Sequence, residues 1–313
     1  MNSTRFPDDL SEIYKEFFPN LRLTPLKTKS KSSCCLLESD NYCIKSSVIR
    51  EQEIFQKFCN LVSTLNNCLA YKVLRNKNNE FLFHYDNSDI FAYEKIEGCT
   101  FTFDHENVSL LGRSLALLHN LMDFPDYLTN NSFLENMIST FLLRDPNSLY
   151  NGLCRKRYVL DYMEANPDIL DKPTNVIHGD MWSENIIFFN KKITFIDFDR
   201  IHVFYRDYEV MRCFFISLLS SFFEKKKSII AALEEYKDYF ISYVSINALS
   251  LTSAFDFYTF VLCLECDVED KAQNSVDMLL FFKKRQFLLL ALIEGRKEIL
   301  TTFNSWIGGL NVA

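Results

Sequence analysis

The stretch VIHGDMWSENIIFFNKKITFIDFD, residues 176–199, decides how the chain is interpreted. Its apolar runs predict three short strands, at residues 175–178, 184–189 and 193–198. The turn-forming residues 190–192 predict a hairpin between the last two strands. The sequence on both sides has helical periodicity, so we expect a small β island inside a helical half of the protein.

Three oxygen-bearing side chains stand at the strand ends and loops of this island: Asp180, Asn185 and Asp197. The hairpin folds Asn185 back toward Asp197, so both can offer oxygens to one hard divalent cation such as Mg²⁺. Asp180 is left to accept a proton from a hydroxyl that attacks a phosphoryl group, or to orient it. The spacing Asp-x-x-x-x-Asn, followed by an apolar strand and Asp-Phe, matches the phosphoryl-transfer template of kinases.

Composition excludes several other classes. The 313 residues carry a net charge of −7, which lacks the basic excess that binding to nucleic acid requires. We see no signal peptide, and the longest apolar stretch, residues 213–223, is about half of the ~20 residues that cross a bilayer. We therefore expect a cytoplasmic protein with no membrane segment. Cys263 and Cys266 have Cys-x-x-Cys spacing, but no second pair completes a zinc site, so a helical packing stripe is the preferred interpretation.

The sequence has two parts with different secondary-structure patterns. Before residue 98, strand-like runs surround one helix, and beyond it long helical stripes dominate. The predicted strands cover residues 33–38, 41–46, 71–74, 81–84 and 90–93, with a helix at 54–65. The predicted helices of the second part include residues 108–122, 229–243 and 278–299. We expect an N-terminal lobe at 1–97 and a helical C-terminal lobe at 98–313.

The motif residues resemble a known family. His178-Gly179-Asp180, Asn185 and residues 196–199 look like the signature of the aminoglycoside phosphotransferase and choline kinase superfamily, which shares its fold with protein kinases. Gly179 and Trp182 stand where a protein kinase would carry Arg and Lys, which favours the small-molecule branch. The resemblance implies an α+β, bilobal, protein-kinase-like fold, with a small β-rich N-terminal lobe and a larger, mainly helical C-terminal lobe.

The same resemblance implies a catalytic Asp180, the metal ligands Asn185 and Asp197, and a Lys that neutralises the phosphates of ATP. Lys45, on a predicted strand, takes that place. Its orienting partner would be a helix carboxylate, and Glu51 fits the family spacing better than other acidic residues nearby. The implied cofactors are ATP and Mg²⁺.

Two further segments would complete the nucleotide site in such an enzyme. The sequence AYEKIEG resembles the hinge between the lobes, where the backbone of Glu94, Lys95 and Ile96 would hydrogen-bond the adenine ring. The loop before the Lys-bearing strand, which includes Ser32 and Ser33, would cover the phosphates. It contains no Gly, although Ser and Lys can donate hydrogen bonds to phosphate.

Other polar residues have structural alternatives. The resemblance implies that His178 braces the catalytic loop. His119 closes an apolar helix, so we expect a core or capping role for it. Asp199 either contacts a second metal ion or hydrogen-bonds the local backbone. Glu209 falls near the position of a family Asp that supports the catalytic loop, and Asp207 is a rival for that role.

The predicted function is ATP- and Mg-dependent transfer of the γ-phosphoryl group to a hydroxyl of a small molecule, such as an aminoglycoside, choline, homoserine or a sugar-like acceptor. Acidic residues at 265–270 either attract a cationic acceptor or form a solvated turn. One alternative is a non-catalytic nucleotide-binding module, which the glycine-free loop motivates. The other is a protein Ser/Thr kinase, against which Trp182 counts. The sequence leaves the oligomeric state open.

Overall fold

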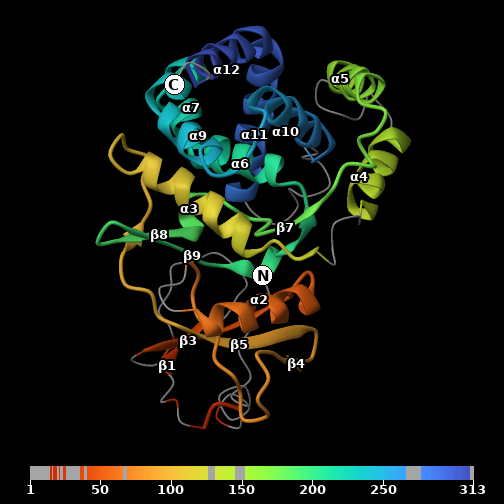
Figure 1. Cartoon of the computed structure of the whole chain (residues 1–313). Coiled ribbons are helices and arrows are strands. Elements are labelled where there is room, and N and C mark those ends of the chain that lie inside the picture. The colour runs from red at the N-terminus through yellow and green to blue at the C-terminus, as the bar shows by residue number, and fades with distance from the viewer. Residues whose placement is uncertain are drawn as a thin grey trace.

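The computed structural model describes residues 15, 17–19, 21, 24–25, 36–38, 41–65, 69–125, 131–144, 152–265 and 276–310. They form a small lobe built on one sheet and a larger, mainly helical lobe, which lie one above the other in Figure 1. The predicted α+β bilobal fold is therefore confirmed. The predicted division at 97/98 stays a prediction.

The small lobe is an antiparallel sheet with one helix, α2 (Gln52–Thr64), packed against it. The strand order is β1-β2-β3-β5-β4, with bounds Thr24–Pro25, Leu36–Glu38, Tyr42–Ser47, Ser88–Glu94 and Phe83–Tyr85 for β1, β2, β3, β5 and β4. The buried ring of Phe55 on α2 lies 5.3 Å from the ring of Phe91 on β5. Lys45 is paired with Phe91 in the β3–β5 register, which places it in the centre of this sheet.

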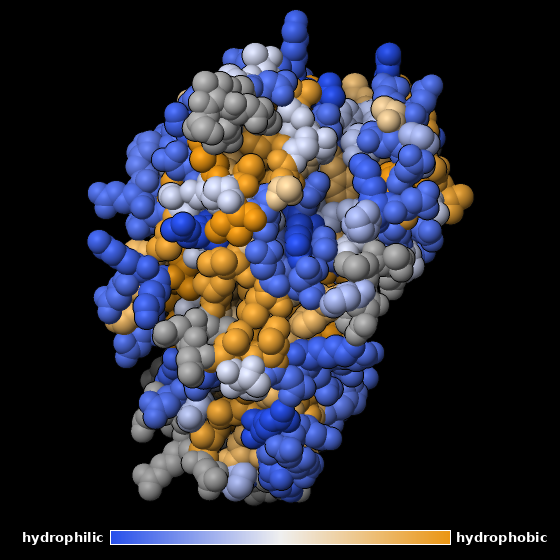
Figure 2. All heavy atoms as spheres, in the orientation of Figure 1, coloured by the Kyte–Doolittle hydropathy of each residue, from blue (hydrophilic) through white to orange (hydrophobic). Residues whose placement is uncertain are grey.

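Ten helices of the described residues build the large lobe. They are α3 (Val108–Leu121), α4 (Ser132–Leu143), α5 (Gly152–Ala165), α6 (Arg206–Ser217), α7 (Leu219–Glu224), α8 (Ile229–Glu235), α9 (Lys237–Val244), α10 (Leu251–Glu265), α11 (Val276–Glu294) and α12 (Arg296–Leu310). Helix α10 lies at the centre, and the side chains from Phe255 to Phe260 on it are nearly all buried. Hydrophobic side chains also reach the surface where the lobes meet in Figure 2.

The predicted β island is present between the helices. Strands β8 (Ile186–Phe189) and β9 (Lys192–Phe195) form the hairpin, and β6 (Cys99–Thr100) pairs with β8. A second ribbon joins β7 (Asn175–Ile177) to β10 (His202–Phe204). Asn190 and Lys191 have φ angles of 48° and 59°, the left-handed conformation of a two-residue hairpin turn.

Three predicted elements differ from the structure. Residues 71–74 were expected as a strand but contain a single bridge, from Val73 to Tyr93 of β5, because the chain just before them, at Leu69 and Ala70, is bonded to β9 instead. The stripe at 229–243 is broken at Tyr236 into α8 and α9. The helix expected at 278–299 ends at Glu294, and Gly295, a poor helix former, separates α11 from α12.

None of the helices among the described residues is both long enough and apolar enough to cross a membrane.

Helices α3 and α9 approach each other very closely. A Cβ built on Gly112 would lie 2.0 Å from the backbone oxygen of Tyr239, so no larger residue fits at this crossing without moving a helix. The crossing also carries the hydrogen bond between His119 of α3 and Tyr243 of α9, at 2.7 Å. The glycine therefore positions a helix that supports the site described below.

Replacing Gly112 with Ala should destabilise the protein. The clash is with backbone, which cannot rotate away, so we expect the free energy of unfolding to fall by about 1–3 kcal/mol despite the better helix propensity of Ala. Urea denaturation of Gly112→Ala measures this. The exposed neighbour Arg113→Ala is the control and should stay within about 0.5 kcal/mol of the wild type. Equal stability of Gly112→Ala and the wild type would contradict the close packing.

Candidate active site

The loop that carries Asp180 follows β7 through a sharp turn. Gly179 has φ 81°, and a Cβ at this position would lie 2.2 Å from the carbonyl oxygen of Arg200. Only glycine meets both conditions without strain. His178 is fully buried, its Nε2 lies 2.8 Å from the carbonyl oxygen of Ile196, and its ring packs on Phe198. This contact supports the bracing role expected for His178.

Glu209 of α6 holds this loop from behind. Its carboxylate accepts hydrogen bonds from the backbone amides of His178, at 3.0 Å, and Gly179, at 2.6 Å. The Nε2 atom of His119 lies 3.0 Å from the same carboxylate. Of the two rivals for the supporting role, the structure therefore favours Glu209 over Asp207, and it places His119 in the core as expected.

The pKa of Glu209 reflects this arrangement. Burial alone would raise the pKa, but the hydrogen bond from His119, the electrostatic interactions with the His119 and His178 rings and the hydrogen bond from the Gly179 amide outweigh it and lower the pKa to about 2. Burial lowers the pKa of His119, so at neutral pH a neutral ring donates to a charged carboxylate. The Glu209 anion accepts hydrogen bonds from His119 and from the amides of His178 and Gly179.

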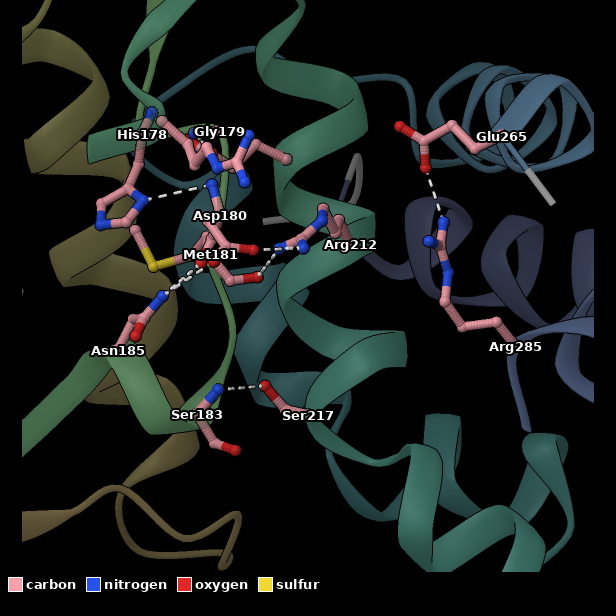
Figure 3. A network of polar contacts seen from close by, with 12 residues as sticks. His178, Gly179, Asp180, Met181, Ser183, Asn185, Arg212, Ser217, Glu265 and Arg285 are labelled. Carbon is pink, nitrogen blue, oxygen red and sulfur yellow. Dashed lines mark hydrogen bonds and ion pairs between the residues drawn. The ribbon is translucent and has the colours of Figure 1, made fainter. Parts of the chain in front are cut away.

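Asp180 projects from the loop toward α6, as Figure 3 shows. Its Oδ1 lies 2.6 Å from Nη2 of Arg212, whose Nη1 also donates to the carbonyl oxygen of Met181 at 2.8 Å. Burial would lower the pKa of Arg212, but the charge of Asp180 raises it above its ordinary value. The other oxygen, Oδ2, has only a long contact of 3.4 Å with Asn185. Oδ2 is thus the more weakly bonded of the two carboxylate oxygens.

Asn185 and Asp197 are brought together by the hairpin. Ile186 is paired with Phe195, and the amide of Ile196 donates to the carbonyl oxygen of Asn185 at 3.0 Å. The side-chain amide of Asn185 donates to the backbone oxygen of Asp180 at 2.8 Å, so its Oδ1 is not used in that bond. Asp197 has φ 69°, a left-handed conformation that is costly for a residue other than Gly and concentrates at functional sites.

Lys45 reaches across from β3 to the large lobe. Its Nζ forms ion pairs with Asp197 and, at 2.5 Å, with Asp199. Burial would lower the pKa of Lys45, but the charges of Asp199 and Asp197 raise it above its ordinary value. The pair with Lys45 is a role for Asp199 that neither of the expected alternatives included. Glu51 lies at the N-cap of α2 and is exposed, so its predicted role as the partner of Lys45 stays a prediction.

The hinge follows β5 directly. The amides of Glu94 and Lys95 donate to the carbonyl oxygens of Lys72 and Asn41, both at 2.9 Å. The amide of Ile96 donates to no oxygen among the described residues. Ser32 and Ser33, expected in the phosphate loop, lie outside the described residues, as does Cys266.

Acidic residues after α10 were considered as a cationic-acceptor site. Glu265 accepts hydrogen bonds from Arg285, at 2.6 Å, and from the Tyr208 hydroxyl, at 3.2 Å. It is therefore already neutralised by Arg285 (Figure 3). The other acidic residues of this segment lie outside the described residues.

Sequence reasoning missed Arg212. It stands one helical turn after Glu209, at i+3, so it projects from the same side of α6. That spacing was the available signal, but it gains meaning only once Glu209 is known to support the catalytic loop.

With this geometry in place, the comparison with known families is informative. Residues 104–238 match the model of the phosphotransferase enzyme family. This match confirms the resemblance that the motifs indicated. It includes Asp180, Asn185, Asp197 and Glu209, whereas Lys45 lies outside it. The expectation of a phosphotransferase acting on an alcohol group is confirmed at the level of the enzyme family.

Solved structures share the fold of this phosphotransferase. An amicoumacin kinase in complex with AMP-PNP and Ca²⁺ is 14% identical, with a TM-score of 0.66 over 93% of this chain and 94% of that chain. A microcompartment-associated aminopropanol kinase is 15% identical, with a TM-score of 0.62 over 93% and 98%. An ethanolamine kinase of Plasmodium vivax is 15% identical, with a TM-score of 0.55 over 92% and 90%. A search of curated proteins found no match.

Replacing Glu209 with Gln tests the support of the catalytic loop. The amide can accept only through its one oxygen and turns an NH₂ group toward buried donors, so we expect unfolding free energy to fall by about 1–3 kcal/mol at neutral pH. A carboxyl with a lowered pKa stabilises the fold above its ordinary value of 4.5 and loses this contribution as the pH falls toward about 2. Urea unfolding at a series of pH values should therefore show the gap between wild type and variant narrowing at low pH.

The control for this experiment is Glu234→Gln, at an exposed position of α8, which should follow the wild type throughout. A gap between Glu209→Gln and the wild type that stays constant from neutral pH to about pH 3 would contradict the charged state assigned to Glu209.

Proposed function

We propose that this phosphotransferase moves the γ-phosphoryl group of ATP to a hydroxyl of a small molecule with the aid of Mg²⁺. One observation carries the proposal: Asp180, Asn185, Asp197 and Lys45 form a continuous set across the two lobes. Asn185 contacts Asp180, its backbone is bonded beside Asp197, and Asp197 pairs with Lys45. This is the order of groups that phosphoryl transfer to a hydroxyl requires.

Asp180 acts on the acceptor. Arg212 fixes its Oδ1, which leaves Oδ2 to accept the proton of the acceptor hydroxyl. The hydroxyl oxygen forms the new bond to the γ-phosphorus as the bond from that phosphorus to the bridging oxygen breaks, and ADP leaves. With one oxygen held, the carboxylate is oriented before the acceptor arrives, and such positioning is the main source of rate in this chemistry.

We propose that nucleotide binds between the two lobes, through Lys45, the hinge and the loop that precedes the strand of Lys45. Lys45 would exchange its carboxylate partners for the phosphates, with Glu51 as its orienting residue. Of the hinge residues Glu94, Lys95 and Ile96, the amide of Ile96 is the donor left for the adenine ring, since the other two amides are already bonded. Ser32 and Ser33 are proposed to donate to the phosphates from the preceding loop.

The residues present fit a divalent cation. The side-chain amide of Asn185 donates to Asp180, so the side-chain oxygen Oδ1 of Asn185 is available to a cation. Asp197 supplies a carboxylate. Within the described part of the chain, Asp199 has a buried oxygen, Oδ1, that lacks a hydrogen-bond partner. Hard oxygen donors of this kind suit Mg²⁺. When bound there, Mg²⁺ would neutralise charge that develops on the phosphates. Asn185 and Asp197 are the proposed ligands.

The acceptor is proposed to be a small hydroxyl compound, since the fold is shared with an aminopropanol kinase and an ethanolamine kinase. Four of the described cysteines, Cys59, Cys99, Cys154 and Cys213, are free thiols, which suits the reducing cytoplasm that we propose as the location. The absence of Gly from residues 27–33 favours the second candidate, a nucleotide-binding module without catalysis. Retention of a base and two metal ligands argues for the enzyme.

Asp180→Asn should abolish transfer and spare nucleotide binding. The amide keeps the shape but cannot take a proton, so we expect kcat to fall by about 100-fold or more. ADP release with a panel of small hydroxyl compounds measures turnover, and calorimetry with ATP measures binding. Asp161→Asn, at an exposed position of α5, is the matched control and should behave as the wild type. Full turnover by Asp180→Asn on any acceptor would refute the role of Asp180.

Asp197→Asn should remove the dependence on Mg²⁺. Asn tolerates the left-handed backbone, so the change acts on the ligand charge rather than on the fold. Wild-type protein should bind ATP more tightly with Mg²⁺ than without it and hydrolyse ATP slowly. Both effects should disappear in the variant, and Asp238→Asn, exposed on α9, should keep them. Absence of any hydrolysis or Mg²⁺ effect in the wild type would instead support the non-catalytic module.

A further inference from the structure

A small pocket adjoins the catalytic loop in the large lobe. It lies among the loop, α6, α7 and α11 and has a volume of about 160 Å³. Five apolar side chains form most of its wall: Trp182, Ile216, Leu219, Leu280 and Phe281. Ser220 and Lys284 complete the lining. None of these residues has a role in the nucleotide site described above.

The pocket is next to the group that receives the acceptor. Trp182 follows Asp180 by two residues in the loop. Ile216 stands four residues after Arg212, on the same side of α6, which is about 6 Å along the helix axis. Arg212 itself holds Asp180 at 2.6 Å. The pocket therefore lies about one helical turn along α6 from the residue that holds Asp180, and on the same side of this helix.

The wall offers apolar contact rather than charge. The ammonium of Lys284 donates to Ser220, at 3.4 Å, and pairs with Glu224, at 2.5 Å. The nearby carboxylates of Asp180 and Glu265 are likewise paired, with Arg212 and Arg285. Glu224, Asp180 and Glu265 thus already have cationic partners, and Glu184, the remaining carboxyl of the loop, is exposed and does not line the pocket. Such a wall rewards an apolar group and gives a polycation little to bind.

Pocket size limits the apolar group. A dry cavity of about 150 Å³ lined by aliphatic and aromatic side chains holds one benzene molecule. A pocket of about 160 Å³ is therefore matched to one six-membered ring or a comparably branched chain. A larger cavity of about 540 Å³ lies farther along α7 and α11, near Phe287 and Ile299, and includes none of the catalytic groups.

We propose that the pocket beside Trp182 binds an apolar group of the acceptor, about the size of one ring, while the acceptor hydroxyl lies at Asp180. The inference rests on the proposed function and names its substrate class: an alcohol whose hydroxyl is separated by a few bonds from a compact apolar group. Trp182, Leu280 and Phe281 are then the residues that determine specificity. Fully hydroxylated or polycationic acceptors lack a group for this pocket.

Binding can be tested without turnover. The chain has two tryptophans, Trp182 and Trp306, so fluorescence can report occupation of the pocket. Titration with 3-cyclohexyl-1-propanol should give a saturable change that 1-propanol, which shares the hydroxyl and chain but lacks the ring, does not give. The change should be absent in Trp182→Phe. A change that survives in Trp182→Phe comes from Trp306 and would overturn the proposal, as would no change in the wild type.

Turnover provides the second arm. With ATP, kcat/KM for 3-cyclohexyl-1-propanol should exceed that for 1-propanol by about tenfold or more. Leu280→Gln should reduce this ratio and weaken the fluorescence change. Leu160→Gln on α5 is the matched control, because Leu160 and Leu280 are 47% and 44% exposed. Equal ratios in Leu280→Gln and Leu160→Gln would overturn the inference.

The two proposals fail separately. If both alcohols react equally well through Asp180, the function stands and the apolar pocket has no part in it. If ATP is neither bound nor hydrolysed, the proposed function fails, and the fluorescence titration still decides whether the pocket binds the ring. If neither alcohol is a substrate, the fluorescence titration still tests whether the pocket binds the ring.

Discussion

The carboxylate of Glu209 is the interaction on which the site depends. It accepts hydrogen bonds from two consecutive loop amides and lies against the ring of His119, so one buried anion ties the catalytic loop to α6 and α3. A buried charge is expensive unless its hydrogen-bonding capacity is satisfied. Here the loop can satisfy it only in one conformation, because Gly179 must have a left-handed backbone. The loop that presents Asp180 is therefore held in place by its hydrogen bonds to the buried carboxylate of Glu209.

Other acidic side chains of the site are also paired with cations. Asp180 has Arg212, and Asp197 and Asp199 share Lys45. One cation faces Asp180 and a single ammonium is shared by Asp197 and Asp199, which reduces the mutual repulsion of these clustered carboxylates without cancelling it. On the side proposed for the acceptor, Glu265 is paired with Arg285. Apolar contact beside Trp182 is then the interaction that this side still offers to a small molecule.

Local patterns in the sequence were sufficient for part of this arrangement. The hairpin of β8 and β9, and with it the approach of Asn185 to Asp197, follows from short apolar runs around a turn. Long-range partners could not be predicted in this way. Arg212 meets Asp180 only after α6 packs on the loop, and nothing near Asp199 in the sequence points to Lys45. The break at Tyr236 has the same origin, because the apolar periodicity continues across it while α8 and α9 pack separately.

The reach of Lys45 has a kinetic consequence. Its ammonium belongs to the small lobe, while both of its carboxylate partners belong to the large one, so the pair fastens the lobes together in the absence of nucleotide. Under the proposed function, an incoming triphosphate would have to compete for a cation that is already paired with two carboxylates. Binding of the phosphates would then exchange one anion for another at a single ammonium. Under the proposed function, loss of this ion pair between the lobes would accompany nucleotide binding.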